Sequence, residues 1–375
     1  MGYWRRVLAA VGAVLMLSFG SVQASETFDE ELYQEQLEES GAQGLMDTLP
    51  PETQAFLSEL GVEGAGWESL AAIEPEGFFQ GLYRFFTEGL SQPLAAAGSL
   101  MGILLLCSLM GGVRVSFGEK QTGTVLAVVG TLCACAVISP PVISCVYQAT
   151  QLIRAAGALL LAGTPVLAGI LTACGKPVSA SGWTIFLLAA GNGVSFLSAA
   201  VLLPVMNLFL GLSLVSAVSP EIRLDSLCAV FAKSVRWVLG LVVSIFCSLL
   251  TAQTMIASSA DGAAVKAGKM LVGFVPVVGS AIGDAMAAVQ GCLKLVKSGV
   301  GGFALVAALC LFLPVILQCL LWILCCTVCA AAGDLLGLSE ISGVLRASGQ
   351  VLQTLLAILI SCLVILIVSG VLMMQ

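Results

Sequence analysis

The chain has 375 residues, of which 59% are apolar and only 10% are charged, and its net charge at neutral pH is −7. A mean hydropathy of +1.05 excludes an ordinary soluble globular protein. Several apolar runs exceed the roughly 20 residues that a helix needs to cross a bilayer. The runs are continuous and do not alternate with polar residues, which favours helical spans over a barrel. The composition therefore predicts an all-α, polytopic membrane protein.

The sequence contains no histidine, which excludes Ser-His and Cys-His nucleophiles and any His-ligated metal. The 14 cysteines begin at Cys107 and lie mostly inside apolar runs, where cysteine acts as a small buried hydrophobe. Asp261, Asp284 and Asp334 form no recognisable catalytic dyad, and there is no glycine-rich phosphate loop followed by Lys-Ser or Lys-Thr. We therefore expect a protein that is not an enzyme and that has no metal, no cofactor and no nucleic-acid partner.

Residues 1–24 are predicted to be a cleavable secretory signal. Arg5 and Arg6 precede the apolar stretch Val7 to Phe19, and Val22-Gln23-Ala24 provides a cleavage site with small residues. The alternative is an uncleaved membrane anchor. Either interpretation places the next segment outside the cytoplasm.

Residues 25–92 are predicted to form a small acidic, helical, extracytoplasmic segment. They contain 15 acidic residues and one basic residue, Arg84, whereas residues 93–375 contain 7 acidic and 12 basic residues. Apolar residues recur at helical three-to-four spacing, for example at Phe78, Leu82 and Phe85. The acidic surface is either a solvated face or a docking surface for a partner outside the membrane.

Residues 93–375 are predicted to form a membrane domain of about seven spans. The apolar runs that define them lie at about 94–113, 123–146, 155–174, 183–219, 235–257, 299–332 and 351–374. The run 183–219 crosses either once or twice. A single crossing places the most basic loop, with its four lysines, in the cytoplasm, and Lys/Arg asymmetry favours that arrangement. The lysines of this loop are Lys266, Lys269, Lys294 and Lys297.

The stretch 269–298 is predicted to form a hairpin at the membrane. It is too apolar for a solvated loop, and glycine and proline interrupt it too often for an ordinary span. It either lies on the inner leaflet or enters the membrane and returns, which requires contact with protein or with a water-filled cavity. The residues predicted to form this pore or subunit contact are Gly273, Phe274, Pro276, Gly279, Gly283 and Asp284. Asp284 is the charge most expected to be buried.

Several of these features, taken in order, resemble the stage III sporulation protein AE family. The resemblance is densest over residues 213–303. Its motifs are Val218-Ser219-Pro220-Glu221, Gln253, Ala260-Asp261-Gly262, Lys266, Lys269, Phe274-Val275-Pro276-Val277-Val278-Gly279, Asp284-Ala285 and the run 293–301.

The resemblance implies a role in an assembly rather than a reaction. Members belong to the transenvelope channel complex between mother cell and forespore, together with a secretion-type ATPase and ring-forming proteins. It implies a location in the mother-cell membrane around the forespore, as membrane platform or conduit. The competing hypothesis is a stand-alone small-molecule permease, since a polytopic chain with discontinuous helices also fits that class.

Overall fold

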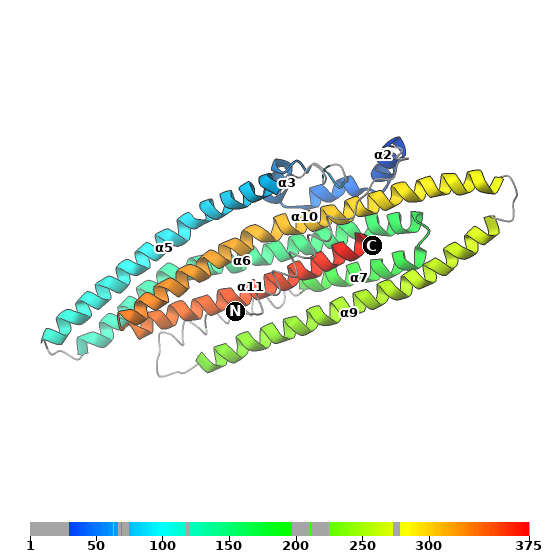
Figure 1. Ribbon diagram of the computed structural model, residues 1–375. Helices are drawn as coiled ribbons and strands as arrows, with labels where there is room; N and C mark the ends of the chain where they lie inside the picture. Colours follow the sequence, from blue (N-terminus) through cyan, green and yellow to red (C-terminus); the bar gives the residue numbers. More distant parts are fainter. Residues whose placement is uncertain are drawn as a thin grey trace.

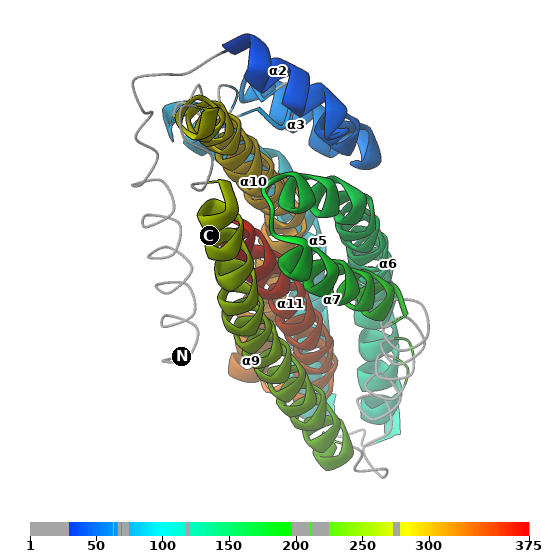
Figure 2. The same cartoon turned by 90° about the vertical axis from the view of Figure 1, so that its right-hand side faces the viewer.

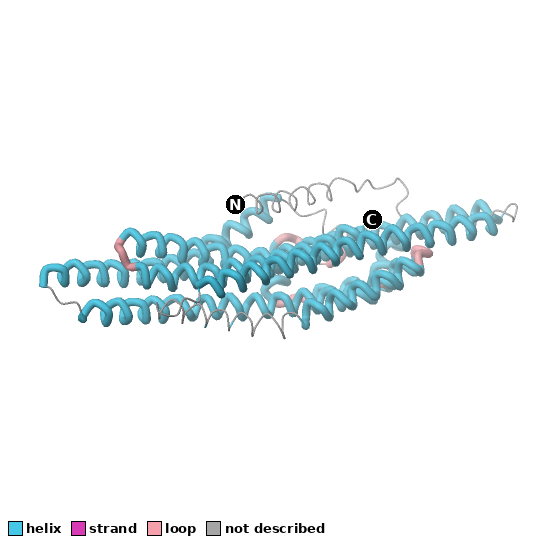
Figure 3. Tube along the Cα trace, turned by 90° about the horizontal axis from the view of Figure 1, so that it is seen from below, coloured by secondary structure: helices cyan, strands magenta, loops and turns pink. Residues whose placement is uncertain are grey.

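The computed structural model describes residues 30–62, 64–66, 69, 75–117, 121–196, 207, 211, 225–272 and 278–374. Every regular element within these ranges is helical, so the all-α prediction is confirmed there (Figure 3). The predicted signal, residues 1–24, lies outside the described residues.

The acidic segment folds into three short helical elements. They are α2 (Glu30–Glu39), the 3-10 helix η1 (Ala42–Thr48) and α3 (Pro51–Glu59). Pro51 occupies the first turn of α3, where its missing N–H costs nothing. Gly41, with φ 70°, adopts the left-handed conformation that joins α2 to η1. The apolar sides of these elements are buried, as Tyr33, Leu45 and Leu57 show.

The rest of the described chain forms six long helices that run side by side and reverse direction at each end (Figure 1). They are α5 (Pro75–Phe117), α6 (Gln121–Ala173), α7 (Pro177–Phe196), α9 (Asp225–Val272), α10 (Val278–Leu335) and α11 (Ser339–Met374). The 58 residues of α10 make a rod. At 1.5 Å per residue the rod is about 87 Å long, whereas the hydrocarbon core of a bilayer is roughly 30 Å thick. α9 and α10 extend past the other helices at one end (Figure 1).

The most buried of the long helices is α11, which lies in the middle of the bundle against α6, α9 and α10 (Figure 2). Leu345, Leu352 and Leu359 repeat every seven residues and are fully buried. A seven-residue repeat of apolar side chains keeps one side of a helix in continuous contact with a neighbouring helix. The partner with the most extensive contact is α10, joined to α11 by a tight turn at Gly337.

Five helical stretches in the described part of the chain are long and apolar enough to cross a membrane. These are Tyr83–Met110, Val128–Ala173, Ala232–Gln253, Gly291–Leu335 and Ser339–Val371. The chain is thus a multi-pass membrane protein, while the number of crossings stays a prediction. Within the run 183–219, residues 197–206, 208–210 and 212–219 lie outside the described residues.

Two of the predicted spans, 123–146 and 155–174, belong to the single helix α6. Pro140, Pro141 and Pro165 all lie inside α6 without ending it. Proline removes a helical hydrogen bond and favours a kink or break. Membrane helices tolerate it where neighbouring groups satisfy the freed carbonyls, and α5, α7, α10 and α11 pack around α6.

Candidate functional site

The residues predicted for the hairpin are spread over the ends of α9 and α10. Gly279, Gly283 and Asp284 lie in the first turns of α10, and Lys266 and Lys269 lie in the last turns of α9. The side chains of Lys266, Lys269 and Asp284 lie outside the described part of the structure. Gly273, Phe274 and Pro276 lie outside it entirely. The hairpin and its pore or contact role therefore stay a prediction.

The buried carboxylate in the described part of the bundle is that of Asp261. Its side chain, on α9, is 1% exposed. Its Oδ1 accepts a hydrogen bond from the backbone N–H of Val178 at 3.1 Å, and its Oδ2 accepts one from Ser179 at 2.9 Å. These N–H groups belong to the first turn of α7, which has no intrahelical acceptors and carries the positive end of the helix dipole. Asp261 thus caps a helix that is distant in sequence.

A second contact joins the same two helices. Gln253 lies two turns before Asp261 on α9, and its side chain crosses the backbone of α7 at Gly182. A Cβ atom at position 182 would lie 1.8 Å from Nε2 and 2.9 Å from Cδ of Gln253. A side chain at position 182 would therefore displace the end of the Gln253 side chain from its present position. Gln253 and Asp261 together hold the start of α7 against α9, and sequence reasoning had singled them out only through the family resemblance.

Three lysines act on the turn between α6 and α7. Lys176 lies in the turn between α6 and α7, where Gly175 takes φ 73°, while Lys294 and Lys297 lie on α10. Burial raises the pKa of the Cys174 thiol in the same turn, and Lys297, Lys176 and Lys294 act in the opposite direction, so all three ammonium groups lie near it. Lys294 is exposed, but Lys297 is only 9% exposed. The sequence predicted Lys294 and Lys297 among the four lysines of one basic loop and did not place Lys176 with them.

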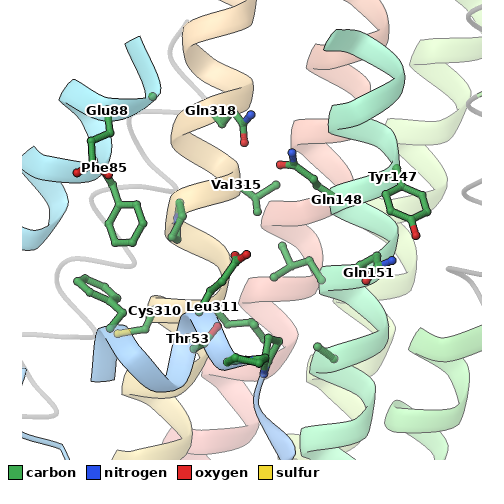
Figure 4. A pocket seen from close by; sticks show the side chains of 18 of the residues that line it. Thr53, Phe85, Glu88, Tyr147, Gln148, Gln151, Cys310, Leu311, Val315 and Gln318 are labelled. Carbon is green, nitrogen blue, oxygen red and sulfur yellow. The ribbon is translucent and has the colours of Figure 1, made fainter. Parts of the chain in front are cut away.

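A cavity of about 760 Å³ separates the acidic helices from the bundle. Glu88 and Phe85 of α5 lie on one side, and Gln318 of α10 and Gln148 of α6 lie on the other (Figure 4). The remaining polar residues that line it are Glu52, Thr53, Gln92, Tyr147 and Gln151. None of the described residues that line this cavity is basic. The glutamines that line the cavity belong to different helices, so no local sequence motif predicted the cavity.

The lower wall of this cavity is held by contacts between α3 and α5. The rings of Phe56 and Phe85 meet edge to face, with centroids 5.0 Å apart. Arg84 forms ion pairs with Glu59 and with Glu88, each at 3.2 Å. All three of these charged side chains are at least half exposed, so the ion pairs orient α3 more than they stabilise it.

The packing of the acidic helices bears on the predicted sidedness of the membrane. Leu45 of η1 shares a small cavity with Val300 and Phe303 of α10, and these residues lie within two turns of Lys297 along the helix. One turn advances about 5.4 Å, far less than the roughly 30 Å of hydrocarbon. The acidic helices and Lys297 therefore lie at a similar level along α10, and the side of the membrane on which each lies stays a prediction.

The described residues contain no group of three or more His, Cys, Asp or Glu side chains that could hold a metal ion. The cluster Cys325, Cys326 and Cys329 is buried within α10. Cys325 donates to the carbonyl oxygen of Pro93 at 3.4 Å, which ties α10 to α5. These thiols have the contacts of packing residues.

Comparison with known proteins identifies the family. The model of the family described as stage III sporulation protein AE matches residues 68–375, which include all the long helices and exclude α2, η1 and α3. The chain is also 24% identical over 245 residues to the stage III sporulation protein AE of Bacillus subtilis (strain 168). That alignment covers 64% of this chain and 60% of the relative, so this chain spans less than two thirds of that protein. No solved structure matches. Because the family model covers most of its length, the chain belongs to the stage III sporulation protein AE family, whose members are membrane proteins of sporulation.

Proposed function

We propose that this chain is a non-enzymatic membrane subunit of the transenvelope, secretion-like channel complex that links mother cell and forespore. It acts there as a platform or conduit, in the mother-cell membrane that surrounds the forespore. Its partners are the other subunits of that complex, including its ATPase and its ring-forming proteins. Family membership supports the sporulation context.

The observation that carries the platform role is the docking of the acidic helices on the bundle. α2 and α3 pack against α10, and η1 packs against α6. The apolar sides of these three elements are buried in this contact, whereas the side chains of Glu35, Glu38 and Glu52 remain exposed. The bundle thus presents an acidic surface in a fixed position, and Arg84, the one base of residues 25–92, is already paired. Such a surface favours basic partners through electrostatic complementarity.

The test is affinity purification of the tagged chain from developing cells in mild detergent, with identification of the proteins retained. Glu35, Glu38 and Glu52 are changed together to glutamine, which removes charge and keeps size. We expect this variant to insert normally and to lose ring-forming partners. The control Lys233→Gln, an exposed charge on α9, should retain them. Deletion of the gene should leave vegetative growth intact and arrest development after engulfment, and a normal yield of heat-resistant spores would contradict the proposal.

One observation favours the second candidate, a stand-alone permease. The cavity beside Gln148 and Gln318 places several side-chain amides in the middle of otherwise apolar helices, and amides there are suited to hold a polar solute. The purified chain alone in liposomes distinguishes the two. Solute exchange that is abolished by Gln148→Leu with Gln318→Leu supports a permease, and the platform role predicts no exchange without partners.

A further inference from the structure

Two prolines free backbone carbonyls at the wall of the cavity between the acidic helices and the bundle. Pro93 lies inside α5, and Pro314 lies inside α10. Because proline has no N–H, the carbonyl oxygens four residues earlier, at Gly89 and Cys310, lack their helical hydrogen bond. Gly89 and Cys310 both line the cavity. Two different helices therefore bring an acceptor without a helical partner to the same cavity.

The positions of these residues turn the freed carbonyls towards the cavity. Gly89 has no side chain, so it lines the cavity with its backbone. Cys310 and Pro314 lie one turn apart on α10 and line the same cavity, so the carbonyl between them lies on that side of the helix. Among the described residues, no side chain donates a hydrogen bond to either carbonyl. The amide of Gln148, on another wall of the cavity, donates to Ser144 at 3.3 Å instead.

The side chains of the wall add negative charge and aromatic surface. Glu52 and Glu88 contribute two carboxylates. Arg84, which does not line the cavity, pairs with Oε1 of Glu88 at 3.2 Å. The rings of Phe56 and Phe85 line the cavity as well, and aromatic faces attract cations. The volume of about 760 Å³ is that of a site for a small organic molecule, roughly 300–1,000 Å³, and far exceeds that of a single metal ion.

We propose that this cavity binds a small organic amine in its protonated form. An ammonium group has three donors and no acceptor, so it is complementary to the freed carbonyls and to the carboxylates. The apolar part of the wall suits the carbon chain of the amine. Binding requires neither partner subunits nor passage of the amine across the membrane, so the purified chain can test it independently of the platform role.

The test is isothermal titration calorimetry of the purified full chain in neutral detergent with hexane-1,6-diamine. The matched control is hexane-1,6-diol, which has the same carbon chain and no charge. We expect saturable binding of the diamine and binding of the diol that is weaker by about tenfold or more, because hydrogen bonds to charged groups are the stronger ones. Magnesium chloride at equal ionic strength should not displace the diamine. Equal binding of the diol, displacement by magnesium chloride, or no binding of the diamine would overturn the proposal.

Two variants locate the site, each with a matched control. Pro314→Ala restores the N–H that the carbonyl of Cys310 lacks and favours helix, so it should fold and bind the diamine about tenfold more weakly. Pro165→Ala makes the same change in α6, away from the cavity, and should bind as wild type. Glu88→Gln should also weaken binding, whereas Glu39→Gln, an exposed acid of α2, should not. Wild-type affinity in both Pro314→Ala and Glu88→Gln would contradict this site.

Discussion

At the scale of single residues, the few charges of this chain are informative because an apolar bundle compensates each one differently. The carboxylate of Asp261 is met by backbone N–H groups of α7. Asp334 is paired with Arg346 across the turn between α10 and α11. Lys297 buries the apolar stem of its side chain, and its ammonium nitrogen is not among the buried atoms that lack a hydrogen-bond partner. The first two charges thus hold helix ends in place, whereas the third keeps its charge at the surface.

Asp261→Ala should destabilise the protein because it leaves two N–H groups of α7 without acceptors. Loss of a helix cap costs about 0.5–2 kcal/mol. Asp261→Asn keeps one acceptor oxygen and should fall between alanine and wild type. The measurement is denaturant unfolding in detergent. Ser259→Ala is the control, since this exposed hydroxyl on the same helix bonds only its own backbone at Met255. Equal stability of Asp261→Ala and Ser259→Ala would rule out the cap.

At the scale of helices, the packing of α9 on α7 depends on the absence of a side chain at Gly182. Gly182→Ala should destabilise the protein because its Cβ displaces Gln253. Gln253→Ala should relieve that clash, so the two changes together should couple by about 0.5–3 kcal/mol. Gly193→Ala on the same helix is the control. It meets open space and should be neutral or slightly stabilising, because alanine favours helix. Purely additive effects of Gly182→Ala and Gln253→Ala would show that the helices do not meet there.

The helices themselves could largely be predicted from the sequence, because apolar length and spacing determine them locally. The continuity of α6 could not, since Pro140, Pro141 and Pro165 predict interruptions that only the surrounding helices override. The burial of Asp261 was missed for a similar reason. Its acceptor role depends on the N-terminus of α7, which lies far away in the sequence. The sequence analysis instead predicted that Asp284 is buried, because its neighbours in the sequence are apolar.

The contact between α6 and α10 can be tested with native cysteines. The thiols of Cys145 on α6 and Cys319 on α10 lie close enough to interact, and both side chains are buried. In a variant that retains only these two cysteines, mild membrane-permeant oxidation should link them, as detected by mass spectrometry of the joined peptides. The pair Cys247 and Cys319 serves as the control and should stay unlinked. Failure of Cys145 and Cys319 to link, in folded protein, would mean that the two helices are in a different register.

At the scale of the whole molecule, the sidedness of the chain depends on how the acidic helices pack on α10. Lys/Arg counting treats each loop separately and places the acidic segment opposite the lysines of α10. The fold instead packs η1 against the stretch of α10 that follows Lys297. Long helices make this possible, because α10 is far longer than a bilayer is thick. Part of α10 must then project from the hydrocarbon core of the membrane.

This geometry predicts which positions share a face of the membrane. Single cysteines introduced at Glu38 and at Lys294, in an otherwise cysteine-free chain, should react with a membrane-impermeant maleimide from the same side, since α2 packs against α10. A cysteine at Leu335, which is 89% exposed at the other end of α10, should react only from the opposite side. It lies 41 residues from Lys294 along one helix, or about 60 Å. If the cysteines introduced at positions 38 and 294 are labelled from opposite sides, the acidic helices do not pack on the bundle when the protein is in the membrane. In that case the seven-span arrangement, with its basic loop in the cytoplasm, would apply.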